Sequence, residues 1–289
     1  MNEKVRISSR ELSGKLLQPL PAESKNVIAF IQNDAAKNAL ILVGGLMEGM
    51  MSLSFDSKLA EALLLVDCAL VQVNLSSSFY GAGIFSLDRD CQELYHVVKC
   101  LKSRHSKIVL MGNSTGCQDA IRYCKLYHEN SEAMIDATIL LCGVSDREAL
   151  SLFPTQALEE ETNEKIFTGE TTHVLKTFLW NFPIRASRFR DLFHRLGDDD
   201  MFSTDLSVSE MTPLFQGVTC PILILHGEDD QYVPNKEALR KQTEVLLTIL
   251  KTTSSYATIA FVPGDHSFPD EKTHPKMITE VIKFLERIL

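Results

Sequence analysis

The chain has 289 residues, of which 45% are hydrophobic and 23% charged, an ordinary balance for a globular protein in water. This length suffices for one large domain with an insertion. A net charge of −9 argues against nucleic acid or an anionic membrane as a partner. No apolar run approaches the roughly 20 residues that span a bilayer, and the N-terminus lacks the pattern of a signal peptide. Seven cysteines without a C-x-x-C pair indicate a reducing compartment, so we expect a cytoplasmic protein.

Apolar runs of strand length alternate with amphipathic stretches through most of the chain. After one or two early strands before residue 21, the predicted strands are 27–32, 39–43, 68–75, 107–111, 135–142, 221–226 and 257–262. The predicted helices are about 54–65, 87–101, a helix that begins at 116, and 273–289. Strands that alternate with helices indicate an α/β fold with a mostly parallel central sheet and helices on both faces.

This alternation stops between about residues 144 and 218, an interval too long for a simple loop. The interval contains the single tryptophan, Trp180, and amphipathic helices fit 146–152 and 173–182. We expect a helical lid at 144–218 that shapes the pocket and excludes water, inserted into an α/β-hydrolase core of residues 1–143 and 219–289. A second packed helical layer without a gating role is the alternative.

Three groups of charged residues lie in this inserted segment. The aspartates at 198–200 lack the further oxygen ligands that a hard cation requires, so we expect no metal there. The glutamates at 159–161 are expected on a solvated helix face rather than in an amine-binding site. The third group is expected to form a solvated helix face rather than bind an anionic substrate. It consists of Arg185, Arg188, Arg190 and Arg195.

A G-x-S-x-G pattern, from Gly112 to Gly116, lies between a predicted strand and a predicted helix. A chain of this length contains the pattern by chance about one time in ten, so the pattern alone also fits a plain Gly-Ser turn. In a strand–turn–helix context, however, the central serine sits on a sharp, strained turn with its hydroxyl exposed above the sheet. Ser114 is therefore the predicted nucleophile of a serine hydrolase.

An acid and a base follow Ser114 in the chain order Ser, Asp, His that this architecture uses. Asp230 lies in the loop after the next-to-last predicted strand, where a carboxylate can fix the tautomer of a histidine. Glu228 and Asp229 are rivals, and Asp229 stays open as the triad acid. Asp230 is preferred because a D-x-x-V-P pattern starts there. His266, in a Gly-x-His segment after the last strand, is the predicted base.

The seven other histidines are expected to be structural. His226 ends a strand, where packing or hydrogen bonding is its usual role, and His274 is expected on an exposed helix start. The other five lie in helical patterns, before the nucleophile strand or in the inserted segment: His96, His105, His128, His173 and His194.

An oxyanion hole requires two backbone donors. The first is the Thr115 N–H, directly after the nucleophile. The second is expected from the Gly-rich loop after strand 39–43, where we favour the Leu46 N–H and keep Gly45 as the alternative. Donors of this kind lower the barrier by roughly 3–4 kcal/mol each. A Gly-rich turn that leads into the next helix is compatible with this interpretation.

Several further segments form a recognisable set: Gly44-Gly45-Leu46 with Gly49, Ser76-Ser77-Ser78 with Gly81 and Gly83, 114–119, 144–149, and Phe202-Ser203 with Asp205-Leu206. With the triad pattern, they resemble the α/β-hydrolase superfamily over residues 27–289. More narrowly, they resemble a eukaryotic family that includes fungal siderophore (fusarinine) esterases. The resemblance implies Ser114, Asp230 and His266 as triad. The family usually has histidine where Asn113 stands and an aromatic residue where Ala82 stands; neither departure removes a triad group, and both are expected to change the pocket.

The sequence thus predicts a serine hydrolase that cleaves a small-molecule carboxylic ester through an acyl-enzyme, with no metal or cofactor. A peptidase or an acyltransferase uses the same triad, so these activities stay open. The alternative from a different class is a non-catalytic binding or scaffold protein, because a fold alone does not establish function. A collapsed pocket, or a lid side chain in the oxyanion hole, would favour that alternative.

Overall fold

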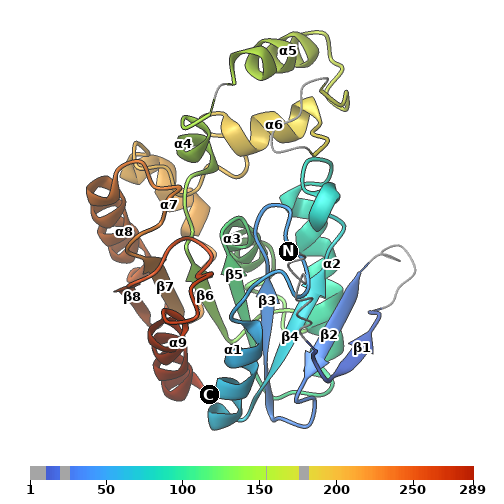
Figure 1. Ribbon diagram of the computed structural model, residues 1–289, viewed down its shortest axis with the longest axis vertical. Helices are drawn as coiled ribbons and strands as arrows, with labels where there is room; N and C mark the ends of the chain where they lie inside the picture. The colour runs from blue at the N-terminus through green and yellow to red at the C-terminus, as the bar shows by residue number, and fades with distance from the viewer. Residues whose placement is uncertain (1–10, 20–26, 154, 176–181) are drawn as a thin grey trace, which may run out of the picture.

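A mixed eight-stranded sheet runs through the middle of the molecule (Figure 1). The structure is a computed structural model and describes residues 11–19, 27–153, 155–175 and 182–289. The strand order is β1-β2-β4-β3-β5-β6-β7-β8; the β1–β2 and β2–β4 pairs are antiparallel and the others parallel. The strands are β1 (Lys15–Leu17), β2 (Ile28–Gln32), β3 (Asn38–Val43), β4 (Cys68–Asn74), β5 (Ile108–Asn113), β6 (Ala137–Leu141), β7 (Ile222–Gly227) and β8 (Ala257–Val262).

The central strands are buried from end to end. Every residue of β3, β5, β6 and β7 is buried, and most of them are aliphatic. Continuous apolar runs of this kind are typical of parallel strands that helices cover on both faces. The predicted α/β fold with a mostly parallel sheet is therefore confirmed, and each strand predicted from residue 27 onward lies close to its expected position.

Helices cover the two faces of the sheet and form two separate hydrophobic cores with it. One face is covered by α1 (Asp56–Leu63) and α9 (His274–Ile288), which contact each other. The other is covered by α2 (Leu87–Lys102), α3 (Gly116–Tyr127) and α8 (Lys236–Leu250). Two short 3-10 turns, η2 (Leu64–Val66) and η3 (Phe79–Gly81), flank β4.

The sequence of α2 explains both its start and its packing. The Ser86 hydroxyl caps the first turn by accepting the Arg89 N–H. Leu94, Val98 and Leu101 recur at helical spacing and are buried in the core. Near the N-terminus the same buried stripe contains Asp90, which brings a carboxylate inside the protein.

Among the described residues, four helices lie between β6 and β7; the first three have a hydrophobic cluster of their own, while the last packs into the main core. Figure 1 shows α5 and α6 at the end of the molecule farthest from the C-terminus. Phe182 and Phe189 are fully buried in this cluster, which also contacts the half-buried Leu46 and Met47 of the core. The helices are α4 (Asp146–Leu150), α5 (Gln156–Phe167), α6 (Ala186–Phe193) and α7 (Val208–Phe215).

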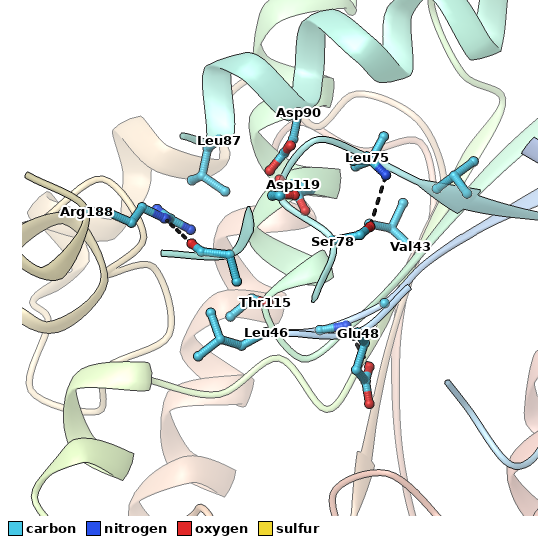
Figure 2. A pocket seen from close by; sticks show the side chains of 15 residues that line it. Val43, Leu46, Glu48, Leu75, Ser78, Leu87, Asp90, Thr115, Asp119 and Arg188 are labelled. Carbon is cyan, nitrogen blue, oxygen red and sulfur yellow. Dashed lines mark hydrogen bonds between the residues drawn. The ribbon is translucent and has the colours of Figure 1, made fainter. Parts of the chain in front are cut away.

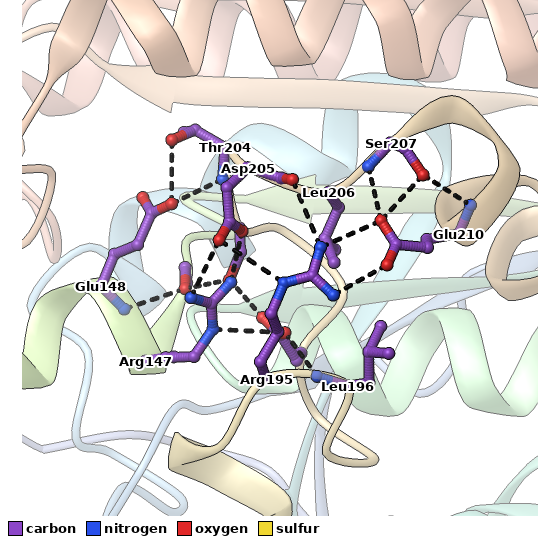
Figure 3. A network of polar contacts seen from close by, with 12 residues as sticks. Arg147, Glu148, Arg195, Leu196, Thr204, Asp205, Leu206, Ser207 and Glu210 are labelled. Atoms are coloured by element: carbon purple, nitrogen blue, oxygen red, sulfur yellow. Dashed lines mark hydrogen bonds and ion pairs between the residues drawn. The ribbon is translucent and has the colours of Figure 1, made fainter.

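A network of ion pairs ties the start of this segment to its end (Figure 3). Arg147 at the start of α4 pairs with Asp200 and Asp205, and Arg195 pairs with Asp205 and with Glu210 in the first turn of α7. The helix α4 follows β6, and α7 precedes β7, which is the neighbour of β6 in the sheet. The network therefore holds the two ends of the inserted segment next to each other.

The structure corrects two expectations about the inserted segment. Arg188 does not belong to a solvated face: it is 5% exposed and pairs with the buried Asp199. The helix predicted at 173–182 is not helical in its described part, where Val174 instead forms a β-bridge with Arg185. Residues 176–181 of that prediction, Trp180 among them, lie outside the described residues. In the part of the chain that the structure describes, no helix is long and apolar enough for a bilayer crossing.

Candidate active site

Ser114 occupies a sharp turn between β5 and α3. Its backbone φ is 54°, a left-handed value that a side chain adopts only under strain, and its N–H donates to the Leu141 carbonyl of β6 at 2.9 Å. Glycine is required at position 112, because a Cβ there would lie 2.0 Å from the Gly116 carbonyl oxygen. The turn thus holds the Ser114 hydroxyl beyond the carboxyl end of the central strand.

His266 and Asp230 reach Ser114 from loops that follow β8 and β7. The imidazole Nε2 lies 2.7 Å from Ser114 Oγ, and Nδ1 lies 2.7 Å from Asp230 Oδ2. Since a carboxylate only accepts, the hydrogen is assigned to Nδ1, and Nε2 is left to accept the Ser114 hydroxyl hydrogen. Both partners are buried, Asp230 at 1% and His266 at 5% exposure. The structure therefore brings together the three residues that the sequence selected.

The two rival acids point elsewhere. Asp229 has a 74% exposed side chain and lies 3.7 Å from Lys236 Nζ, while Glu228 pairs with Arg240 on the surface. Asp230 has its second oxygen occupied as well, since Oδ1 accepts the Tyr232 N–H at 2.9 Å. Of the three neighbouring acids, only Asp230 can orient the imidazole in this geometry.

The loop that carries His266 is anchored by a histidine that the sequence analysis placed wrongly. His274 was expected on an exposed helix start, but its side chain is fully buried. Its Nε2 donates to the Phe268 carbonyl oxygen at 2.7 Å, and Ser54 Oγ donates to the same oxygen at 2.9 Å. Phe268 packs in the core below with a φ of 49°. These bonds connect the His266 loop to α1 and α9.

The loop after β3 passes directly beside Ser114. A Cβ at Gly45 would lie 2.7 Å from Ser114 Cβ, so only glycine allows this approach. The Gly45 N–H donates to Glu48 Oε2 at 2.7 Å. In contrast, within the described residues neither the Leu46 nor the Thr115 N–H donates to another protein group. The arrangement favours Leu46 and Thr115 over Gly45 as donors to a substrate oxygen.

A cavity of about 200 Å³ opens in front of the nucleophile. The inserted segment forms one wall of it through Val144, Asp146 and Ala149. The opposite wall comes from the β3 loop and from the loops that carry the acid and the base. Its other lining residues include Leu46, Met47, Glu48, Ser114, Tyr232 and His266. A cavity of this size accommodates a small organic group beside Ser114.

Two ionisable groups near the triad have shifted pKa values. Burial raises the pKa of Asp146 to about 8, with the Asp199 carboxylate adding to the rise and the hydrogen bond from Gln118 opposing it. Burial lowers the pKa of His226, behind Asp230, to about 4, which keeps that imidazole neutral. Asp146 thus presents to the cavity a carboxyl group whose pKa is raised.

One group of side chains in the described residues has metal-ligand spacing, and it overlaps the triad: Cys142, Asp230 and His266. Both ring nitrogens of His266 are already bonded, and burial raises the pKa of Cys142 far above its usual value. A protonated thiol and an occupied imidazole are poor metal ligands. The aspartates at 198–200 also suit ion pairs rather than a cation, since Asp199 and Asp200 face arginines.

Glu48 and Asp146 were not predicted as site residues, and Asn113 was noted only as a departure from the family pattern. Glu48 Oε2 also accepts a hydrogen bond from Asn113 Nδ2 at 3.2 Å, which links the β3 loop to the residue before the nucleophile. A carboxylate within a Gly-rich loop was a usable signal for Glu48. Asp146 was detectable because it follows β6, a neighbour of the nucleophile strand, at the edge where ligands bind.

Comparison with known proteins identifies the family. Residues 13–286 match the family described as "Protein of unknown function (DUF1749)". The UPF0613 protein PB24D3.06c of Schizosaccharomyces pombe is 29% identical over 280 residues, which cover 88% of this chain and 87% of that protein. Fusarinine C esterase sidJ of Aspergillus fumigatus is 29% identical over 254 residues, covering 68% and 72%.

Among solved structures, siderophore hydrolase EstB from Aspergillus fumigatus superposes with a TM-score of 0.77 at 21% identity, covering 96% of this chain and 98% of that one. A second neighbour, described as an alpha/beta hydrolase fold protein of unknown function, has a TM-score of 0.69 at 19% identity and covers 97% of each chain. The predicted resemblance to α/β-hydrolases and to the family of fungal siderophore esterases is confirmed. The chain belongs to the DUF1749 family and has the α/β-hydrolase fold.

Proposed function

We propose that the protein is a serine esterase in which Ser114 is the nucleophile, His266 the general base and Asp230 the residue that orients the base. One observation carries the proposal: His266 lies 2.7 Å from Ser114 Oγ on one side and 2.7 Å from Asp230 Oδ2 on the other. A hydroxyl, an imidazole and a buried carboxylate in this order form the arrangement that activates serine for acyl transfer.

The reaction follows from the protons in this arrangement. Ser114 Oγ attacks the ester carbonyl carbon while His266 Nε2 takes the hydroxyl proton, and the Asp230 carboxylate stabilises the resulting imidazolium. The tetrahedral intermediate collapses as His266 returns the proton to the departing alcohol, which leaves an acyl group on Ser114. Water then attacks the acyl carbon as it gives a proton to His266, and the second intermediate releases the acid as His266 returns that proton to Ser114 Oγ.

We assign to the Leu46 and Thr115 N–H groups the role of stabilising the negative charge that develops on the carbonyl oxygen. Thr115 stands at the N-terminus of α3, where the helix dipole also favours an anion. Donors fixed in advance stabilise an oxyanion more than mobile water does, and one such donor is worth roughly 10²- to 10³-fold in kcat.

The substrate is proposed to be a small-molecule carboxylic ester. The named relatives support this class: one acts on fusarinine C, and another, from Emericella nidulans and 24% identical, is named an esterase. We further propose that residues 144–218 act as a cap on the core of residues 1–143 and 219–289, since Val144, Asp146 and Ala149 line the cavity. The open cavity beside Ser114 favours an enzyme over a binding protein with a blocked site.

Hydrolysis of short-chain esters, followed by acid release, tests the proposal. Wild-type protein should turn over at least one ester of a varied acyl series, and Ser114→Ala should lose that activity to background. Ser131→Ala, at an exposed serine that does not line the cavity, is the control and should retain the activity. A folded Ser114→Ala protein with unchanged activity would refute the assignment.

A further inference from the structure

A second, smaller cavity lies against the loop after β3, residues 44–48 (Figure 2). Its volume is about 20 Å³, enough for one group the size of a water molecule, which requires roughly 10–15 Å³. It shares Gly45, Leu46 and Glu48 with the cavity in front of Ser114, and Thr115 also lines it. The two cavities therefore adjoin each other along this loop.

Two buried carboxylates face this small cavity. Asp90 of α2 is 2% exposed and Asp119 of α3 is 5% exposed, and both line it. In each of them Oδ1 has no hydrogen-bond partner among the described residues. Buried carboxylate oxygens are nearly always hydrogen-bonded, so two unpartnered ones around one cavity indicate that a donor binds there.

These two carboxylates share the positive charge of Arg188 with a third acid, Asp199. Arg188 of α6 lines the cavity, but both of its terminal nitrogens donate to Asp199 and its Nε donates to the Ala82 carbonyl at 3.2 Å. One guanidinium thus stands among three carboxylates. Burial accordingly raises the pKa of Asp90 to about 7 and that of Asp119 well above its usual value. A bound cation would relieve this imbalance.

We propose that this cavity, which we call the acidic subsite (Asp90, Asp119, Ser77 and the Leu46 loop), binds a primary ammonium group of the ester substrate. This inference rests on the proposed function and names its substrate class: esters that carry a free amine. An ammonium group brings three donors and one charge, and it is about the size of a water molecule. Guanidinium and trimethylammonium groups exceed the volume.

A metal ion fits the acidic subsite less well. Within the described residues, the cluster of potential ligands with metal-binding spacing lies at Cys142 and does not include Asp90 or Asp119. Two carboxylates with few further oxygens fall short of what a hard cation requires. An ammonium group instead has three hydrogens to donate, and the subsite offers three acceptors for them: the two carboxylates and a hydroxyl such as that of Ser77.

Matched pairs of esters test the inference. Ethyl esters of ω-amino acids of increasing length are compared with isosteres in which a methyl group replaces the ammonium, for example 3-aminopropanoate with butanoate. At one chain length at least, kcat/KM should be tenfold or more higher for the ammonium member. The trimethylammonium analogue should lose this advantage. Equal kcat/KM values within every pair would overturn the inference while leaving the esterase proposal intact.

Two isosteric variants locate the effect. Asp119→Asn and Asp90→Asn should each reduce the ratio of kcat/KM for the ammonium ester to that for its isostere by tenfold or more. Asp88→Asn lies on the same helix as Asp90 but has a 58% exposed side chain, so it is the matched control and should keep the ratio. A ratio that persists in both buried variants would contradict the assignment.

A binding measurement separates this inference from the esterase proposal. Calorimetry with propylammonium, and with propanol as the neutral probe, is done on the Ser114→Ala protein, which needs no turnover. Propylammonium should bind measurably tighter than propanol, and the double variant Ser114→Ala/Asp119→Asn should lose the difference. Equal binding of the two probes would refute the acidic subsite even if ester hydrolysis is observed, and a difference would support it even if none is.

Discussion

The Glu48 carboxylate holds the Gly45 amide at 2.7 Å and, through the same oxygen, the Asn113 side chain at 3.2 Å. One residue thus connects the β3 loop to the last residue before the nucleophile. It also removes the Gly45 N–H from the set of free donors, which is consistent with the Leu46 N–H as the proposed oxyanion donor.

Loss of this connection should lower the rate of the chemical step. Glu48→Ala removes the acceptor for both bonds and lets the loop move, so kcat should fall roughly 10- to 100-fold, less than the loss of a whole oxyanion donor. Glu48→Gln keeps an acceptor oxygen and should retain most of the activity. Steady-state kinetics on one ester checks both variants; equal losses in Ala and Gln would show that charge, rather than loop geometry, is what matters.

The choice between the two neighbouring aspartates has a direct kinetic test. Asp230→Asn preserves the shape but not the charge at His266, and kcat should fall by about 10⁴-fold, the size of effect known for the triad acid of a serine protease. Asp229→Asn alters an exposed side chain 3.7 Å from Lys236 and should leave kcat nearly unchanged. A larger loss in the Asp229 variant would reverse the assignment.

The buried ion pair of the inserted segment should matter for stability far more than an exposed one. Arg188→Met leaves the Asp199 carboxylate buried without a partner, which should lower the free energy of unfolding by about 3–5 kcal/mol. Arg195→Met breaks pairs at a half-exposed arginine and should have little effect, because exposed ion pairs contribute little. Denaturant titration of both variants measures this difference in stability. Similar unfolding midpoints for the two variants would contradict the prediction.

His226 should make stability fall in mild acid. The ring is 2% exposed and stacks on Phe261 with centroids 5.3 Å apart, and its burial lowers the pKa to about 4. Between pH 6.5 and 4 the unfolded chain binds the proton and the folded protein does not, so stability is lost as the pH falls through that window. At about 1.4 kcal/mol per pKa unit, the effect is on the order of 3 kcal/mol.

The matched variant isolates this contribution. Asp146, whose folded pKa is raised to about 8, works in the opposite direction, because its protonated form is favoured in the folded protein as the pH falls from 8 toward 4. Urea denaturation gives the free energy of unfolding of wild type and of His226→Gln at several pH values. The contribution of Asp146 is common to both proteins and cancels in their difference. The stability difference between the two should shift in favour of His226→Gln from pH 7 to pH 4.5; a constant difference would exclude the mechanism.

The sheet and the positions of the triad were predictable because local patterns carry them. Strand runs such as 108–111 are continuous and apolar, and the glycines at 112 and 116 mark a sharp turn between that strand and the next helix. The choice of Asp230 over Asp229 was open, because adjacent residues of one turn point in different directions that only the folded loop determines.

The errors arose where distant contacts override local pattern. His274 starts a helix, as predicted, but the Phe268 carbonyl and Ser54 bury its ring. Arg188 lies in an arginine-rich stretch that suggests a solvated surface, yet Asp199 draws its side chain inside. Asp90 and Asp119 are distant in sequence and meet only because α2 and α3 pack together. A single sequence does not reveal which polar residues such packing will enclose.

Labelling with a fluorophosphonate probe, followed by mass-spectrometric mapping of the adduct, tests whether Ser114 is an activated nucleophile. One adduct is expected, on Ser114, which is absent in Ser114→Ala and strongly reduced in His266→Ala. The dependence on His266 matters because it shows activation by the base rather than mere exposure of a hydroxyl. A folded wild-type protein whose Ser114 stays unlabelled, or labels equally well without His266, would contradict the account.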